Sequence, residues 1–299
     1  MIQPADAAED LDVTVVLPAY NEVGHIRDEV DRISAALKDS AYSFEILVID
    51  DGSSDGTGEA VDGLPFVRLI RFPKNRGSGT ARRIGSMQAH GRYVVWTDAD
   101  MTYPNERIPE FIDHLESSDA DQVVGARTSE KGTMKPLRVP AKWTIRRLAE
   151  YLTDSKIPDL NSGLRAFDRE VARPYLGLLP SGFSCVTTLT LSFLANGHIV
   201  EYVPIKYAQR AGRSHFHPIK DAYRYILQVL RMVTFFEPLR VFAPIALTLL
   251  LVGSGKFVYD QFQEPFRIAA NTLLMLLGGL IVFSLGLLAD LIVRTNRQG

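Results

Sequence analysis

Short apolar runs alternate, over the first part of the chain, with stretches in which apolar residues recur at helical spacing. Five apolar runs predict strands, at residues 13–17, 44–49, 66–72, 92–97 and 122–125. A helix over residues 21–38 is marked by Val23, Ile26, Val30, Ile33 and Leu37, and a second helix runs to about His90. This alternation predicts an α/β fold with a mostly parallel sheet, helices on both faces and ligands at the carboxyl ends of strands.

The pattern is less regular after Gly125. Residues 128–139, which include Gly132 and Pro136, predict an exposed loop and a candidate lid over the site. We expect helices at residues 142–153 and 187–194 and a strand at residues 199–207.

Two long apolar runs near the end of the chain, residues 241–259 and 272–293, predict helices that cross a membrane. Lys256 lies at the end of the first run, where it can snorkel, and Asp290 and Arg294 are spaced to pair near the headgroups. The segment between the runs is too short for a domain, so we expect a membrane hairpin. Two buried core helices are the alternative, which the length and apolarity of the second run disfavour.

The segment before the hairpin, residues 218–236, predicts an amphipathic helix with Lys220, Arg224 and Arg231 among its apolar positions. This composition suits a helix on an anionic membrane surface, and a core helix is the alternative. Basic residues are more frequent on the flanks of the hairpin than near its loop, which places both flanks in the cytoplasm. We therefore expect an integral protein of the bacterial inner or plasma membrane, with a cytoplasmic domain (1–217), a juxtamembrane helix (218–238) and a hairpin (239–299).

Composition narrows the function classes. The 299 residues are 46% hydrophobic, enough for a large core, and the net charge of −2 argues against a general nucleic-acid binder. Cys185 is the only cysteine, so no intrachain disulfide can form, as suits a reducing compartment. Residues 1–12 are polar and show no signal peptide.

The richest chemistry follows the fourth predicted strand. In Asp98-Ala99-Asp100 the two carboxylates can face one point, because residues i and i+2 of an extended chain project to the same side. A divalent cation together with a diphosphate relieves the repulsion between them, and the alternative is a pair of solvated loop acids. Gly77-Ser78-Gly79 lacks the residues of a nucleotide phosphate loop, and no dinucleotide fingerprint follows the first strand.

Three blocks in order, Leu17 to Glu22, Asp50 to Ser53 and Asp98 to Asp100, resemble the nucleotide-sugar-binding half of the family 2 glycosyltransferases, which have the GT-A fold. The similarity continues in Asp159-Leu160-Asn161-Ser162-Gly163-Leu164-Arg165 and in Arg210-Ala211-Gly212-Arg213-Ser214, which are similar to blocks of polyprenyl- and dolichyl-phosphate sugar synthases. The match covers nearly the whole chain. Thr102 and His215 depart from it, since many members have Gln and Lys there.

The resemblance implies a role for each matching residue. Nucleoside contacts fall to Pro18, Tyr20, Glu22 and Asp51. Asp98 and Asp100 would hold Mg²⁺ or Mn²⁺, with Thr102 as a further oxygen ligand. The phosphate and acceptor contacts fall to Arg127, Arg146, Arg147, Arg210 and Ser214, because the planar guanidinium of arginine binds two phosphate oxygens at once. For each arginine, an ion-paired surface residue is an equally good interpretation.

The acceptor is indicated by an absence. Transfer to a hydroxyl needs a base, which related enzymes commonly supply from a Glu-Asp pair, and here the only such pair is Glu9-Asp10 in the polar N-terminus. A phosphate monoester is already a nucleophile at neutral pH, so a lipid phosphate fits. Asp159 would then position or assist the acceptor as a catalytic residue beside Asp100, with a helix cap as the alternative.

We therefore predict the inverting transfer of one hexose from a nucleotide sugar of the UDP-glucose or GDP-mannose type to polyprenyl phosphate. One alternative is a polysaccharide synthase, since Gln228-Val229-Leu230-Arg231 is similar to part of its signature, although Met232 replaces a tryptophan. The other is a catalytically silent membrane scaffold. We expect no nucleic-acid partner, and a homo-oligomer is left open.

Overall fold

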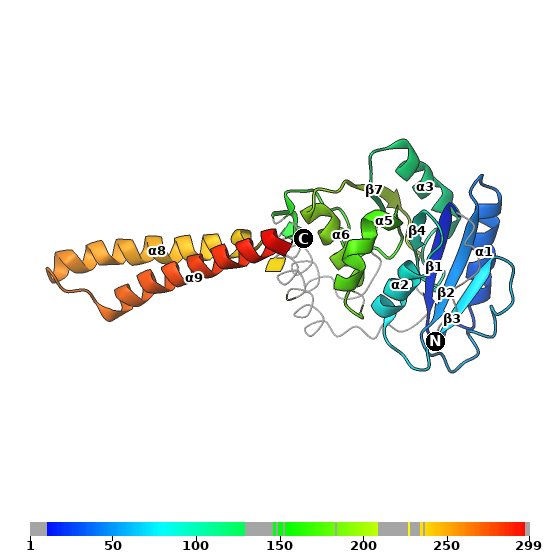
Figure 1. The fold of residues 1–299 in the computed structure, drawn as a ribbon, viewed down its shortest axis with the longest axis horizontal. Coiled ribbons are helices and arrows are strands. Elements are labelled where there is room, and N and C mark those ends of the chain that lie inside the picture. Colours follow the sequence, from blue (N-terminus) through cyan, green and yellow to red (C-terminus); the bar gives the residue numbers. More distant parts are fainter. Residues whose placement is uncertain are drawn as a thin grey trace. The chain divides into compact units, whose positions relative to one another are not determined.

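The computed structural model describes residues 11–128, 146–147, 149–151, 153–182, 184–208, 227, 234–235 and 237–296. The chain divides into two compact units, Met1–Tyr225 and Ile226–Gly299 (Figure 1). Most of the predicted lid and of the amphipathic helix lies outside the described residues, as do Arg210, Ser214 and His215.

A seven-stranded sheet organises the first unit, in the order β3-β2-β1-β4-β6-β5-β7. Its strands are β1 (Val13–Ala19), β2 (Phe44–Asp50), β3 (Val67–Arg71), β4 (Tyr93–Trp96), β5 (Gln122–Arg127), β6 (Arg165–Asp168) and β7 (Val200–Ile205). β1, β2, β3 and β4 form parallel pairs, as do β5 and β7, whereas β6 is antiparallel to β4 and β5. The predicted mostly parallel sheet is confirmed, and β6 was not predicted.

Helices cover both faces of this sheet, as predicted. They are α1 (Ile26–Lys38), α2 (Ser78–Met87), α3 (Ile108–Ser117), α5 (Arg169–Ala172) and α6 (Cys185–Ala195), with 3₁₀ turns η1 (Asn105–Arg107) and η2 (Arg173–Leu178). α1 begins later than predicted because Asn21 has a positive φ of 56° and the N–H groups of His25 and Ile26 both bond to Glu22 O. α3, η1, α5 and η2 were not predicted.

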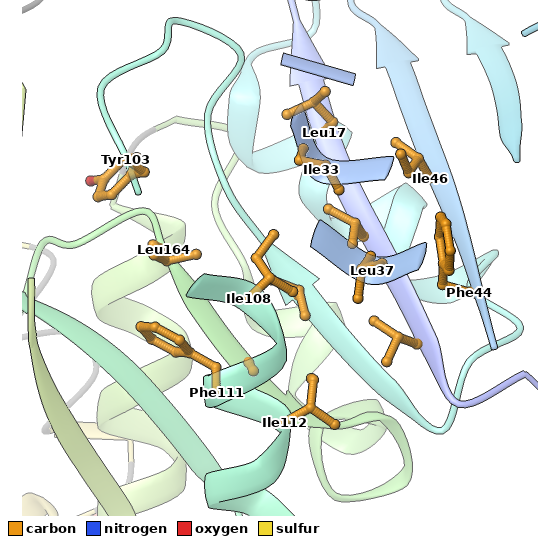
Figure 2. Close-up of a cluster of buried hydrophobic side chains, with 14 of the residues drawn as sticks. Leu17, Ile33, Leu37, Phe44, Ile46, Tyr103, Ile108, Phe111, Ile112 and Leu164 are labelled. Atoms are coloured by element: carbon orange, nitrogen blue, oxygen red, sulfur yellow. The ribbon is translucent and has the colours of Figure 1, made fainter. Parts of the chain in front are cut away.

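Successive residues of β1 divide between two cores, as the period of two in a strand requires. Val15 and Leu17 pack with α1 and α3, and Figure 2 shows this core around Ile33, Ile108 and Phe111. Val16 packs on the opposite face, with residues of α2, η2 and α6. The sheet is therefore buried on both sides, and its strand ends remain as the places where polar loops can gather.

The second unit is a hairpin of two long helices, α8 (Pro238–Gln263) and α9 (Ala270–Asn296). Both are long and apolar enough to cross a membrane, with mean hydropathies of 1.9 and 2.4, and only 11% of each apolar window is buried. Such exposure disfavours the alternative of two core helices.

Glycines let α8 and α9 approach each other closely. A Cβ added at Gly279 would lie 2.8 Å from Leu250 Cγ, and one at Gly286 would lie 2.7 Å from Phe242 Cβ. Near the loop, Lys256 Nζ donates to Asp260 Oδ1 at 2.8 Å, and Thr272 Oγ1 donates to the other oxygen of Asp260. Lys256 is thus ion-paired within the hairpin, and its charge is neutralised there.

Candidate active site

The segments after β1 and β2 are joined to each other by hydrogen bonds. Asp51 N donates to Ala19 O at 2.8 Å, Asn21 N donates to Ser53 Oγ at 3.0 Å, and Ser54 N donates to Asn21 Oδ1 at 3.0 Å. The loop after β1, which carries Tyr20 and Glu22, and the loop after β2, which carries Asp51, therefore lie together, with Pro18 near the end of β1. Tyr20 is 48% exposed at this strand end, so it is accessible to a ligand.

The carboxylate of Asp51 is buried and already occupied by the backbone. Its Oδ1 accepts from Arg76 N at 2.7 Å and its Oδ2 accepts from Gly77 N at 2.8 Å. The neighbouring Gly52 has φ +78°, and a Cβ there would lie 2.6 Å from Lys74 C. Asp51 therefore fixes the loop before α2, a positional role that its sequence motif alone does not reveal.

The first turn of α2 is packed against the loop that precedes α6. A Cβ at Gly77 would lie 2.3 Å from Ser181 O, and one at Gly79 would lie 2.0 Å from Pro180 O. Gly79 N donates to Ser181 O at 2.8 Å. The two glycines serve this close approach, and the N–H group of Gly79 meets a protein carbonyl instead of a phosphate.

Asp98 and Asp100 follow β4 on one tight loop. Asp98 Oδ1 forms an ion pair with Arg82 Nη2 from α2, and the Asp98 side chain remains 31% exposed. Asp100 Oδ1 accepts from the Thr102 hydroxyl at 2.5 Å, and Thr102 itself is buried. Met101 between them has φ 60°, which turns the chain. Each carboxylate is thus oriented by a separate side chain.

A buried polar network holds this loop from the side of α1 and η1. Asn105 Nδ2 donates to Glu29 Oε1 at 2.6 Å, Thr97 Oγ1 donates to Asn105 Oδ1 at 2.6 Å, and Arg32 Nη2 donates to Tyr103 O at 2.5 Å. Burial raises the pKa of Glu29 above its ordinary value, although hydrogen bonds from Asn105 and Arg32 oppose the rise. The network limits the freedom of the loop that presents the two aspartates.

Arg127, at the end of β5, is paired with Asp159. Arg127 Nε donates to Asp159 Oδ2 at 2.6 Å and Nη2 donates to Oδ1 at 2.9 Å, with the two side chains 14% and 10% exposed. Burial alone would raise the pKa of Asp159, but the hydrogen bonds and charge of Arg127, with the N–H groups of Asn161 and Arg127, outweigh it and hold that pKa below its usual value. Asp159 is therefore an ionised carboxylate.

Tyr103 joins the aspartate loop to the Arg127–Asp159 pair. Gly163 N donates to Tyr103 Oη at 2.7 Å, and a Cβ at Gly163 would lie 2.8 Å from Asp98 Oδ2. The Tyr103 ring also packs edge-on against Tyr207, with centroids 5.0 Å apart, and the Arg127 guanidinium lies 5.4 Å from the Tyr207 centroid. Two tyrosines packed edge-on therefore connect the loop that carries the two aspartates to the Arg127 guanidinium.

The remaining candidates fall elsewhere or outside the described residues. Arg146 and Arg147 are half-exposed and exposed, and each approaches Glu150, at 3.8 Å and 3.4 Å. Among the residues that the structure describes, no group of three or more His, Cys, Asp or Glu side chains could hold a metal ion. Mg²⁺ is commonly held by one or two carboxylates together with substrate phosphates, and Asp98 and Asp100 fit that donor set.

Sequence reasoning missed Arg82, Tyr103 and the close approach of Gly163. The signal for Arg82 is present in α2, whose buried residues are otherwise small: Gly79, Thr80, Ala81, Gly85 and Ser86. A long charged side chain among such neighbours indicates a specific buried partner.

Comparison with known proteins gives two family matches. The model of glycosyl transferase family 2 matches residues 14–176, and that of the GtrB C-terminal hairpin matches residues 237–295. Among curated relatives, a dodecaprenyl-phosphate galacturonate synthase of Rhizobium johnstonii is 24% identical to this chain. The alignment covers 97% of this chain and 90% of that protein. A dolichyl-phosphate hexose transferase of Haloferax volcanii is 30% identical in an alignment that covers 69% of this chain and 87% of that protein.

Solved structures share the fold. Glucosyl-3-phosphoglycerate synthase from Mycobacterium tuberculosis, in complex with Mn²⁺, uridine diphosphate and phosphoglyceric acid, superposes with a TM-score of 0.60 and 21% identity. The match covers 75% of this chain and 78% of that one.

Proposed function

The chain belongs to glycosyl transferase family 2, and from this premise we propose that it transfers one hexose from a nucleotide sugar to a polyprenyl phosphate at a membrane surface. The observation that carries the proposal is the arrangement around Tyr103. Two carboxylates, Asp98 and Asp100, are each oriented by another side chain, and the packed rings of Tyr103 and Tyr207 connect their loop to the paired guanidinium of Arg127. A site of this kind suits a reaction between two phosphate-bearing substrates.

The donor would bind at the ends of β1, β2 and β4. Pro18, Tyr20 and Glu22 would contact the nucleoside, and the exposed Tyr20 offers a flat apolar ring to a base. Asp51 would contribute by holding the loop before α2. Asp98 and Asp100 would hold Mg²⁺ or Mn²⁺, with Thr102 orienting Asp100 or adding its own oxygen. When bound, the cation would supply positive charge to the departing nucleoside diphosphate.

The acceptor would be an ionised phosphate. A carboxylate that serves as a general base works best with a pKa near the working pH, whereas the pKa of Asp159 is lowered. A phosphate monoester has its second pKa near 6 and needs no base at neutral pH. Asp159 would therefore position Arg127 for that phosphate, and Arg210 and Ser214 would add contacts from outside the described residues. The names of the relatives given above support this acceptor class, since each combines a polyprenyl phosphate with a sugar.

The hairpin would keep this site at the membrane, where a lipid-linked phosphate lies. The basic flanks of the hairpin support a cytoplasmic first unit and cytoplasmic termini, with the loop between α8 and α9 on the far side. A cysteine at Gln263 in a Cys185→Ser background should therefore react with an impermeant maleimide in whole spheroplasts. One at Ser129 should not, and the reverse pattern would overturn this orientation.

Transfer itself is tested with the purified full chain, a panel of nucleotide sugars, and polyprenyl phosphate against the matching free polyprenol. We expect a single-sugar phosphodiester from the phosphate and no product from the alcohol. Asp100→Ala should abolish the product, because the variant would no longer hold the cation whose charge stabilises the departing diphosphate, a contribution of about 3–4 kcal/mol. Equal use of the alcohol, or near-normal turnover of Asp100→Ala in EDTA, would contradict the proposal. A growing polymer would favour a synthase, and metal-dependent binding without transfer would favour a silent scaffold.

A further inference from the structure

Arg82 is an unusual residue for the interior of α2. It is 1% exposed, and its guanidinium lies over the ring of Trp96, 5.8 Å from the centroid. Burying a guanidinium is costly unless it is paired and hydrogen-bonded. Arg82 Nη2 forms an ion pair with a single carboxylate oxygen, Asp98 Oδ1.

The surroundings of Arg82 do not form a satisfied structural network. Its Nε and Nη1 atoms are buried and make no hydrogen bond to the part of the chain that the structure describes. The Cys185 thiol interacts with Arg82, but a thiol is a weak acceptor, and burial raises its pKa, so it stays neutral. A second buried arginine, Arg165, lies 6.0 Å from the same Trp96 centroid and donates to neutral oxygens, among them Val186 O and Thr190 Oγ1. Of these two buried arginines, Arg82 is the one that is ion-paired with Asp98.

Asp98 is held from both sides by this arrangement. Arg82 takes Oδ1, and the backbone of Gly163 lies so close to Oδ2 that an added Cβ would be 2.8 Å away. The terminal torsion of an aspartate is otherwise broad, so an unrestrained Asp98 would present its oxygens in many directions. The Asp98 side chain remains 31% exposed while it is restrained in this way, so it stays accessible to a ligand.

We propose that Arg82 is a positioning residue, which fixes the Asp98 carboxylate in the orientation that binds the divalent cation. The inference rests on the proposed function, because it assumes that Asp98 is a metal ligand. Arg82 acts through Asp98 and does not itself contact the metal. Residues that orient metal ligands commonly matter almost as much as the ligands, and their loss weakens metal affinity by roughly 10–100-fold.

The test measures Mn²⁺ binding to the detergent-purified full chain, from the loss of the free Mn²⁺ electron paramagnetic resonance signal, with UDP and GDP added in parallel. Arg82→Met should weaken Mn²⁺ binding by roughly 10–100-fold. Arg83→Met is the matched control, because Arg83 is the next residue of α2 and no ion pair is recorded for it among the described residues; it should bind Mn²⁺ like the unmodified protein. Arg82→Gln replaces Arg82→Met if the latter does not fold.

The double variant Arg82→Met/Asp98→Asn separates positioning from other roles. If Arg82 acts through Asp98, the double variant should bind Mn²⁺ no more weakly than Asp98→Asn alone. A further loss in the double variant, or an Arg82 variant whose Mn²⁺ affinity stays within about twofold of the unmodified protein while its melting temperature falls, would overturn the inference and leave Arg82 a packing residue. If Asp98→Asn itself leaves Mn²⁺ binding unchanged, the metal site of the proposed function fails instead.

Discussion

The ion pair between Arg127 and Asp159 gives the sharpest prediction about how the site is held. Asp159 accepts from Arg127 Nε at 2.6 Å, Arg127 Nη2 at 2.9 Å, Arg127 N at 3.2 Å and Asn161 N at 3.0 Å. Each carboxylate oxygen accepts two of these bonds. In Asp159→Asn one oxygen becomes an NH₂ group, so whichever oxygen is replaced, two donors face a donor and Arg127 stays charged without its counter-ion.

The magnitude follows from this geometry. Removing one partner of a buried ion pair costs about 3–5 kcal/mol, because the other charge is left uncompensated. For a unit of this size each kcal/mol lowers the melting temperature by about 2–4 °C. We therefore expect Asp159→Asn to melt about 6–20 °C below the unmodified protein.

Thermal melting of the full chain in detergent, followed by tryptophan fluorescence, measures this shift, and Trp96 in the core of the first unit reports on it. Asp62→Asn is the matched control, since Asp62 pairs with Arg71 at 3.2 Å but its side chain is 66% exposed. Exposed pairs contribute about 0–1 kcal/mol, so the control should shift by less than about 4 °C.

The pH dependence of this shift tests the ionisation of Asp159. Because its pKa is lowered on folding, its contribution is fully present above the unfolded value of about 3.9 and is lost as pH falls through the native pKa. The gap between Asp159→Asn and the unmodified protein should be constant from about pH 8 to pH 5 and narrow only below about pH 4. A gap under 2 °C, or one that closes near about pH 6, would refute the reasoning.

Two glycine substitutions test the remaining contacts. Gly163→Ala should displace the Asp98 carboxylate and lower Mn²⁺ affinity by roughly tenfold, whereas Gly177→Ala, where no atom lies within 4 Å of the new Cβ, should not; equal effects would show that the contact is unimportant. Gly279→Val should separate α8 from α9 and lower the efficiency of a disulfide engineered between them, while Gly278→Val, whose Cβ meets nothing within 4 Å, should preserve it; equal crosslinking would contradict the packing.

The fold was largely predictable because its signals are local. The parallel strands are apolar runs bounded by polar turns, the hairpin is a pair of long apolar runs, and the motif resemblance to family 2 is confirmed. α3 also carried a sufficient signal, since Ile108, Phe111, Ile112 and Leu115 have helical spacing. β6 carried no local signal, because it has four residues and begins and ends with a charged residue, Arg165 and Asp168. It is stabilised as a strand by pairing with both β4 and β5.

The site was less predictable because its decisive contacts join distant segments. The motifs predict that Asp51 and Asp98 lie at strand ends. They do not show that the Asp51 carboxylate accepts hydrogen bonds from the backbone of residues 76–77, or that the Asp98 carboxylate is ion-paired with Arg82. The motif likewise does not show why residues 77 and 79 are glycines. A Cβ at either position would collide with the loop at residues 180–182, about a hundred residues later in the chain. Residue types in a motif indicate the chemistry, and packing decides which atoms remain available for it.

Asp159 illustrates how the structure discriminates between roles that the sequence leaves open. A base that removes a proton from a hydroxyl needs a pKa close to the working pH, and a low-dielectric site could provide one by burial alone. Here burial acts to raise the pKa of Asp159, yet the charge of Arg127 and its two side-chain hydrogen bonds lower that pKa below its usual value. The pair supports an acceptor that arrives already ionised, because its guanidinium suits an anion while its carboxylate is too acidic to take up a proton at neutral pH. The missing Glu-Asp pair and the lowered pKa of Asp159 are independent observations, and both favour a phosphate over an alcohol as the nucleophile.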